Sequence, residues 1–212
     1  RLQARAAGTA GCMRALVLNC TLKPSPATSN TQALADVVVA ALEEKGVEVN
    51  VVRVVDRNVP PGVDTDLGEG DDWRELHRMV LDSEILVMAT PTWLGKPSSI
   101  AQRVLERMDA MISETRDDGT YVAYGKVAGV VVTGNEDGAH HVISEIAGGL
   151  IDVGFTIPGQ AWTYWNMGPG PGPSYLETDR GHDWSEKTGR TMAANLHAAA
   201  TALHANPLPP PS

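Results

Sequence analysis

The chain has few cysteines, a deficit of positive charge and no long apolar run, and each of these scarcities excludes a class of protein. Its two cysteines, Cys12 and Cys20, cannot form a disulfide framework, which favours a reducing, cytoplasmic location. The net charge of -9 disfavours binding to nucleic acid or to an anionic membrane. No apolar stretch approaches the length of a membrane span. We therefore expect a small-molecule partner, with no nucleic acid and no membrane.

Familiar phosphate-binding and metal-binding motifs are also missing. The chain has no G-x-x-x-x-G-K-[ST] for a nucleoside triphosphate and no G-x-G-x-x-G after its first predicted strand. A low-molecular-weight phosphatase needs a cysteine, five further residues and then an arginine, and after Cys20 the place of that arginine is taken by Pro26. His140 and His141 are adjacent on a predicted helix, so they point about 100° apart and do not suit one metal ion. We expect no metal site, and a solvated or capping role for both histidines.

The residues that are present predict alternating strands and helices. Short apolar segments rich in β-branched residues indicate strands, and apolar residues three and four apart indicate helices. The expected strands cover residues 14–20, 47–54, 84–89, 127–132 and 155–163. The expected helices cover residues 30–45, 73–80, 100–111, 140–153 and 184–204. This alternation predicts a three-layer α/β sandwich around a five-stranded parallel sheet of order 2-1-3-4-5.

The length of 212 residues suits one domain with an ordinary core, which we expect at residues 13–204. Residues 1–12 lack the apolar segment of a secretory signal and are expected to form a mobile leader. The proline-rich residues 205–212 are expected to form a disordered tail.

The loop after the first predicted strand has the chemistry of an anion site. Residues 21–31 contain five hydroxyl side chains and one lysine, and they end at the start of a helix. Backbone N–H groups and the helix dipole attract phosphate at such a place. The expected phosphate ligands are Thr21, Lys23, Ser29, Asn30 and Thr31. The alternative is that Ser29 or Asn30 only caps the helix.

Two further loops carry unusual residues, and both follow strands of the predicted sheet. One is Pro91-Thr92-Trp93-Leu94-Gly95, and the other is Thr133-Gly134-Asn135-Glu136-Asp137-Gly138. Ligands of open parallel sheets bind beyond the carboxyl ends of the strands, where the winding reverses. We expect these two loops to meet the phosphate loop there and to form one site.

Ser29-Asn30-Thr31 at the first helix, the Pro-Thr-aromatic-x-Gly turn at 91–95 and the loop at 133–138, in this order, resemble those of the flavodoxin-like flavoproteins. The resemblance is greatest to the NAD(P)H-dependent FMN reductases and quinone reductases, and it covers residues 13–203. It implies a flavodoxin-like fold, bound FMN, NAD(P)H as co-substrate, and a homodimer or homotetramer.

The resemblance also implies a role for each loop. An isolated tryptophan more often belongs to the core, but the place of Trp93 in a Pro/Gly turn after a buried strand favours stacking on the isoalloxazine ring. Gly95 would allow close approach of the backbone, and the N–H groups of Leu94 and Gly95 would reach the flavin N5 and O4 edge. Asn135 and Gly134 would bind the pyrimidine edge. Pro91, Thr92, Thr133 and Gly138 complete the expected cofactor-binding set. Lys96 would stabilise reduced flavin or point to solvent, and Asp137 would cap the next helix.

The implied function is that of an oxidoreductase in which hydride passes from NAD(P)H through FMN to a quinone, a flavin or a nitroaromatic compound. Because the flavin carries this chemistry, no catalytic side chain is expected. One alternative is a flavodoxin-type electron carrier without a nicotinamide substrate. Another is a flavin-free interaction module of the same fold. The Gly/Pro-rich loop at 166–183 is expected either to close over the flavin or contact a partner subunit, or to form a simple surface connection.

Overall fold

The computed structural model describes residues 12–210. The predicted leader therefore lies outside the described residues except for Cys12, as do the last two residues of the predicted tail. Residues 207–210 of that tail contain no helix or strand.

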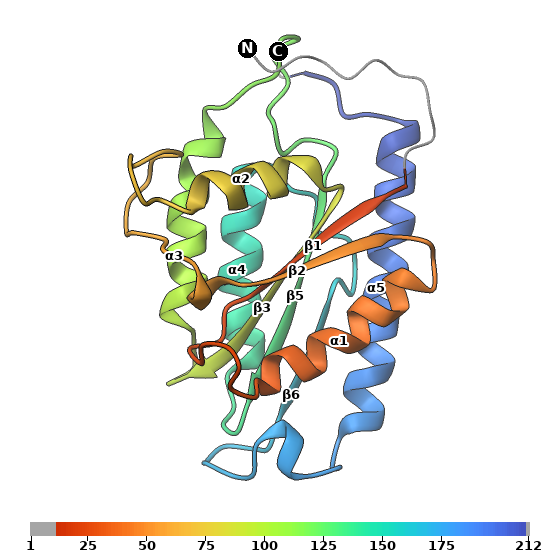
Figure 1. Cartoon of the computed structure of the whole chain (residues 1–212). Helices are drawn as coiled ribbons and strands as arrows, with labels where there is room; N and C mark the ends of the chain where they lie inside the picture. The colour runs from red at the N-terminus through yellow and green to blue at the C-terminus, as the bar shows by residue number, and fades with distance from the viewer. Residues whose placement is uncertain (1–11, 211–212) are drawn as a thin grey trace.

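A parallel sheet forms the middle layer of the molecule (Figure 1). Its order is β2-β1-β3-β5-β6, and all four pairings along this path are parallel. The two residues of β4 (Lys96–Pro97) pair antiparallel with the end of β3 and form a hairpin off this path. The predicted order 2-1-3-4-5 is thus confirmed. The strands are β1 (Arg14–Asn19), β2 (Glu48–Arg53), β3 (Ile85–Trp93), β5 (Val127–Gly134) and β6 (Trp162–Asn166).

Helices cover both faces of the sheet because successive strand residues point to opposite sides. Ala15 and Val17 of β1 belong to the core under α1 (Asn30–Glu43) and α5 (His182–Ala205). Leu16 and Leu18 belong to the opposite core. That second core lies under α2 (Trp73–Asp82), α3 (Ser99–Met108) and α4 (Ala139–Val153). The three-layer, flavodoxin-like α/β fold predicted from the alternation is confirmed (Figure 1).

The last strand was predicted at the wrong residues. Thr156 makes only an isolated bridge with Val127, and β6 begins at Trp162. Pro158 cannot donate to a strand ladder, and Gln160 has a φ of 55° in the turn that follows. The apolar residues Phe155 and Ile157 still pack into the core, which explains the misleading pattern.

The ends of β3 and α3 also differ from the prediction, each by more than two residues. β3 continues through Trp93, beyond the predicted end at residue 89, because its last two residues pair with β4. The helix expected to include Met111 ends at Met108, and Met111 lies in the 3-10 turn η2 (Asp109–Ile112).

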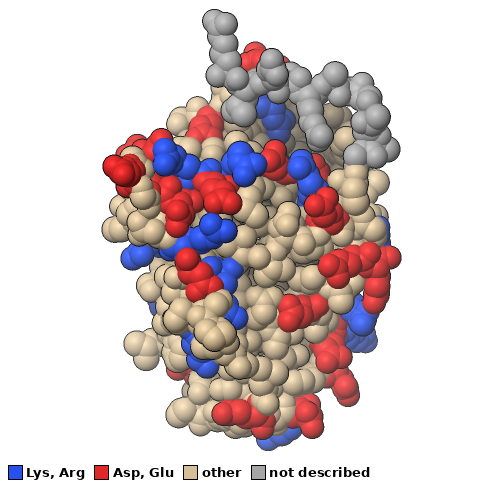
Figure 2. Space-filling view, viewed as in Figure 1, with Lys and Arg blue, Asp and Glu red and all other residues tan. Residues whose placement is uncertain are grey.

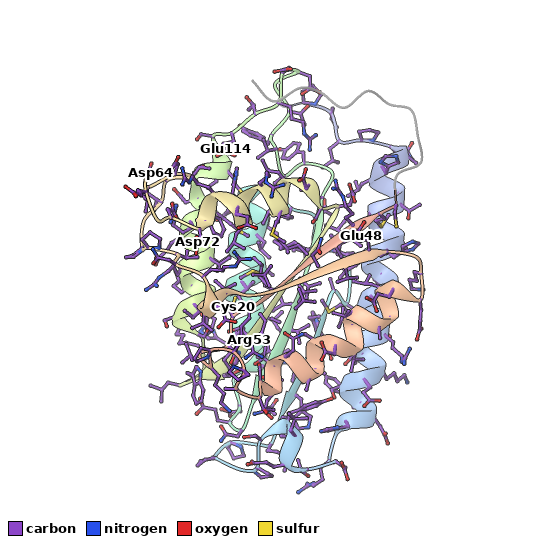
Figure 3. The ribbon with its side chains drawn as sticks, in the orientation of Figure 1. Cys20, Glu48, Arg53, Asp64, Asp72 and Glu114 are labelled. Carbon is purple, nitrogen blue, oxygen red and sulfur yellow. The ribbon has the colours of Figure 1, made fainter. Side chains whose placement is uncertain are left out.

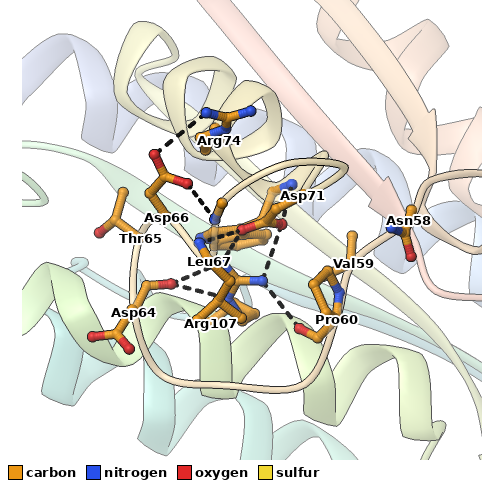
Figure 4. Close-up of polar contacts among 12 residues, drawn as sticks. Asn58, Val59, Pro60, Asp64, Thr65, Asp66, Leu67, Asp71, Arg74 and Arg107 are labelled. Carbon is orange, nitrogen blue, oxygen red and sulfur yellow. Dashed lines mark hydrogen bonds and ion pairs between the residues drawn. The ribbon is translucent and has the colours of Figure 1, made fainter.

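A buried ion pair holds the long connection between the turn η1 (Val54–Asp56) and α2 (Figure 4). The guanidinium of Arg107 is fully buried and donates to both carboxylate oxygens of Asp71, at 2.6 and 3.1 Å. It also donates to the carbonyls of Asp64 and Pro60. Its carbon Cζ lies 5.7 Å from the centre of the Trp73 ring. One side chain of α3 thereby shapes a loop that has no regular secondary structure of its own.

The surface carries charges of both signs. Figure 2 shows acidic and basic side chains interspersed over much of the face in view. Within residues 12–210, no helix is long and apolar enough to cross a membrane. Within the same residues, no group of three or more His, Cys, Asp or Glu side chains could hold a metal ion.

Candidate functional site

A cavity lies at the carboxyl ends of β1, β3 and β5, where the winding of the sheet reverses. It brings together residues from the three loops predicted to meet there, and ten of the fourteen predicted cofactor-binding residues line it. These ten are Thr21, Lys23, Asn30, Thr31, Pro91, Thr92, Trp93, Thr133, Gly134 and Asn135. The other four, Ser29, Leu94, Gly95 and Gly138, are not part of the lining. Leu22, Ser174 and Tyr175 line the cavity without having been predicted.

The side chains expected to hold phosphate at the start of α1 already have partners in the protein. The Ser29 hydroxyl accepts from the Gln32 N–H at 3.1 Å and caps the helix, as in the alternative interpretation. Asn30 Oδ1 accepts from the Leu176 N–H at 3.0 Å. Thr31 Oγ1 lies 2.8 Å from Thr133 Oγ1 and joins the first loop to the loop after β5.

Backbone donors nevertheless remain at this end of the cavity. Among residues 12–210, the N–H groups of Asn30 and Thr31 donate no hydrogen bond. These groups lie at the positive end of the α1 dipole. Lys23 is exposed at the same rim, and Thr21 is almost fully buried beside it. The site thus offers two N–H donors, one hydroxyl and one cation to an anion.

The β3–β4 hairpin forms another wall. Trp93 is 50% exposed, which rules out the core interpretation of this residue. Leu94 and Gly95 both have positive φ, of 52° and 72°, and together make a tight turn. The neighbouring Thr92 is 2% exposed, and its hydroxyl has no hydrogen-bond partner among the described residues. A buried hydroxyl without a partner costs about 1–3 kcal/mol, so a polar ligand group beside Thr92 would stabilise the site.

Two turns touch behind the cavity and require glycine. A Cβ on Gly138 would lie 2.8 Å from Gly95 Cα, and Gly138 itself has a φ of 108°. A Cβ on Gly134 would lie 3.1 Å from Thr92 Cβ. The close contact holds the 91–95 and 133–138 loops in one arrangement.

Several polar groups beside these turns have partners that the sequence did not predict. The Leu94 N–H, expected to face flavin, donates instead to Glu136 Oε1 at 2.5 Å. Lys96 is exposed, as in the solvent alternative, and its Nζ lies 2.6 Å from Glu145 Oε1 and 2.7 Å from His141 Nε2, both on α4. The N-cap of α4 is Gly138, without a side-chain cap from Asp137. These partners come from the loop and the helix that follow β5, and sequence spacing did not indicate them.

The Gly/Pro-rich loop after β6 lies along the cavity rather than away from it. The Gly172 N–H donates to the Asn135 carbonyl, and the Leu176 N–H to Asn30, both at 3.0 Å. The Tyr175 ring stacks on His182 with ring centres 3.9 Å apart and meets Trp165 edge-on at 5.5 Å. These contacts bring Ser174 and Tyr175 to the lining. The signal available in the sequence was an aromatic residue inside a Gly/Pro-rich stretch.

The described site contains no activated nucleophile. Burial raises the pKa of the Cys20 thiol, and the side chain is inaccessible. The arrangement instead suits binding of a molecule with a phosphate at one end and a flat ring at the other. Phosphate would meet α1 and Lys23, and the ring would meet Trp93 and the turn at Gly134.

Comparisons with known proteins show the family of this chain and the relatives that it resembles. A family model described as NADPH-dependent FMN reductase matches residues 13–164. The 8-demethyl-8-aminoriboflavin-5'-phosphate synthase of Streptomyces davaonensis is 38% identical over 207 residues, covering 92% of this chain and 80% of that protein. The crystal structure of RosB with the bound intermediate 8-demethyl-8-formylriboflavin-5'-phosphate superposes with a TM-score of 0.83 at 36% identity, covering 92% of this chain and 82% of that one.

A further relative is named a divalent metal cation transporter, MntH, from Mycobacterium bovis. It is 40% identical over 200 residues, which make up 91% of this chain. The chain spans only 29% of that relative's length.

Proposed function

This chain belongs to the NADPH-dependent FMN reductase family, and from that premise we propose that its cavity binds FMN as the cofactor of an oxidoreductase. In this proposal NAD(P)H is the hydride donor, and a quinone, a free flavin or a nitroaromatic compound is the acceptor. The observation that carries the proposal is that one cavity contains both N–H groups without an acceptor, at Asn30 and Thr31, and an exposed aromatic ring, that of Trp93.

The phosphate would bind at the start of α1. The N–H groups of Asn30 and Thr31 have no competing acceptor among residues 12–210, and Thr21 and Lys23 lie at the same rim. Charge-assisted hydrogen bonds to phosphate are about twice as strong as neutral ones. This end therefore anchors the ligand and orients the rest of it.

The ring would lie between the hairpin and the loop after β5. Trp93 offers a face for stacking, and Asn135 with the backbone of Gly134 offers polar groups for the pyrimidine edge. The Thr92 hydroxyl gains a partner when a polar ligand group lies beside it. Bound FMN supplies the hydride chemistry, so the protein's task is to orient two planar molecules and exclude water.

A second candidate function treats the flavin as substrate. The relative from Streptomyces davaonensis is named as a synthase of a modified riboflavin phosphate, and the RosB structure holds a formylated one. The same cavity would then bind riboflavin 5'-phosphate for conversion rather than as a resident cofactor. An electron carrier and a flavin-free module remain the simpler rivals. Because the chain spans only 29% of the relative named MntH, we propose no transport function for this chain.

Absorption spectra and the mass of the recovered flavin together separate these functions. Protein incubated with FMN and desalted should retain the visible flavin bands, and anaerobic NADPH or NADH should bleach them. Retained but unbleached flavin would support the carrier, and colourless protein would refute flavin binding altogether. After aerobic incubation, an unchanged mass of the recovered flavin supports the cofactor role, whereas a changed mass supports conversion.

Trp93→Ala should weaken FMN binding about tenfold through loss of ring stacking. Trp184→Ala is the matched control, since Trp184 is also exposed, at 45%, but does not line the cavity. Equal affinity of both variants would show that Trp93 does not stack on the flavin.

We propose in addition that the chain forms a homodimer or homotetramer in the cytoplasm. Light scattering of the purified protein would test the proposed number of subunits.

A further inference from the structure

Two residues of opposite charge hold the phosphate loop from outside the cavity. Arg53 ends β2, and Asp56 lies in the following turn η1. The loop itself is exposed from residue 22 to residue 28, so it has little packing of its own. We call Arg53 and Asp56 together the loop brace. Figure 3 labels Arg53 close to Cys20, the residue that precedes this loop.

The brace contacts the loop at three residues. Arg53 Nη1 donates to the Ala27 carbonyl at 2.8 Å and to the Lys23 carbonyl at 3.4 Å. The Asp56 carboxylate accepts from the Ser25 N–H at 2.9 Å and from the Ser25 hydroxyl at 2.5 Å. The Ser25 hydroxyl and N–H also hold the pKa of Asp56 below its usual value.

These contacts determine which groups of the loop are left for an anion. A carbonyl turned into the cavity would repel phosphate, and the guanidinium keeps two carbonyls engaged elsewhere. The brace uses neither the ammonium of Lys23 nor the N–H groups of Asn30 and Thr31. The brace therefore engages the carbonyls of Lys23 and Ala27 and leaves the Lys23 ammonium and the N–H groups of Asn30 and Thr31 available to an anion.

We propose that Arg53 and Asp56 are positioning residues that give the cavity its preference for a phosphorylated flavin over riboflavin. The proposal rests on the flavin function above. Neither residue lines the cavity, so each acts through the loop. Pre-ordering the loop lowers the entropy lost when phosphate binds, and this gain is absent for riboflavin, which has no phosphate.

The opposite charges of the two residues make the proposal testable against a simpler explanation. If the brace acted only by long-range attraction, removing Arg53 would weaken FMN binding and removing Asp56 would strengthen it. If it acts by ordering the loop, removing either residue weakens FMN binding. The sign of the Asp56 effect therefore decides between the two explanations.

The experiment measures dissociation constants for FMN and riboflavin by quenching of flavin fluorescence, with Arg53→Met and Asp56→Ala. Arg57→Met and Glu75→Ala are the controls. Arg57 and Glu75 pair with each other at 3.1 Å on the exposed surface and make no hydrogen bond to the loop. They carry the same charges close by, so they reproduce the electrostatic change without the contacts.

Each brace variant should lower the ratio of FMN affinity to riboflavin affinity about three- to tenfold, the effect of losing one or two partly exposed hydrogen bonds. Riboflavin affinity should stay unchanged, which a general loss of folding would not allow. Arg53→Lys, which keeps one donor group, should restore part of the ratio. Tighter FMN binding by Asp56→Ala, or equal ratios for Arg53→Met and Arg57→Met, would overturn the proposal.

Failure of the brace is distinguishable from failure of the proposed function. If the unaltered protein binds FMN no better than riboflavin, the proposed phosphate site is refuted, and the proposed role of Arg53 and Asp56 is refuted with it. If the unaltered protein prefers FMN and the brace variants keep that preference, only the brace is wrong.

Discussion

Replacing Arg107 by Met should cost the protein about 3–5 kcal/mol of unfolding free energy, because it leaves the Asp71 carboxylate without its buried cation. Asp71 is 4% exposed, and Arg107 is completely buried. The loss includes the hydrogen bonds of the guanidinium to the Asp64 and Pro60 carbonyls (Figure 4). Met fills much of the same volume, so lost packing contributes little to the expected effect.

The lowered pKa of Asp71 gives a second value for the stabilisation that this carboxylate receives in the folded protein. Burial alone would raise its pKa, but hydrogen bonds from Arg107 and from the N–H groups of Leu67 and Trp73 outweigh burial and lower it from 3.8 to about 2. Because the folded pKa is the lower one, this stability is present above pH 3.8 and is lost as the pH falls through 2. The difference corresponds to roughly 2.5 kcal/mol at neutral pH.

Urea unfolding followed by far-ultraviolet circular dichroism measures both effects. Asp71→Asn should remove the Asp71 part of the pH dependence, so its stability should fall less steeply than that of the unaltered protein from pH 5 towards 2. Arg78→Met is the matched control, since Arg78 pairs with Asp82 at 3.5 Å on the exposed surface and should contribute less than about 1 kcal/mol. Equal losses for Arg107→Met and Arg78→Met, or the same acid dependence with and without Asp71, would refute the reasoning.

Two of three further predictions concern the site, and the third concerns the buried Lys126 just before β5. Glu136→Ala frees the Leu94 N–H for the flavin, so FMN should bind more tightly, and weaker binding would show that the carboxylate supports the site instead. Burial lowers the pKa of Lys126 from 10.5 to about 8, so the unfolded chain binds more protons and stability should rise between pH 8 and pH 10.5. Lys126→Met should abolish that rise in urea midpoints, and an unchanged rise would contradict the assignment. Ser29→Ala should lower the unfolding free energy by about 1 kcal/mol through loss of the cap while leaving FMN affinity unchanged, and a large loss of affinity alone would make Ser29 a ligand.

Local patterns were enough to predict most of the fold. Val17, Val87 and Val131 lie in short apolar runs rich in β-branched residues, which favour buried strands, and the intervening helices favour parallel crossovers. The predicted order 2-1-3-4-5, which the structure confirms, then places the three loops at one edge of the sheet. The prediction failed at Phe155, where an apolar residue belongs to the core without belonging to a strand.

The sequence by itself determined the sheet, its helices and the three loops that form the cavity, because strand and helix periodicity are properties of neighbouring residues. Only the tertiary structure decided how the groups in those loops are used. Thr31 meets Thr133, Leu94 meets Glu136, and Tyr175 reaches the cavity beside Asn30. These contacts join residues that are distant in the chain. The periodicity of the sequence does not show which partner forms a hydrogen bond with a given hydroxyl or N–H group. That choice depends on the packing of whole elements against one another.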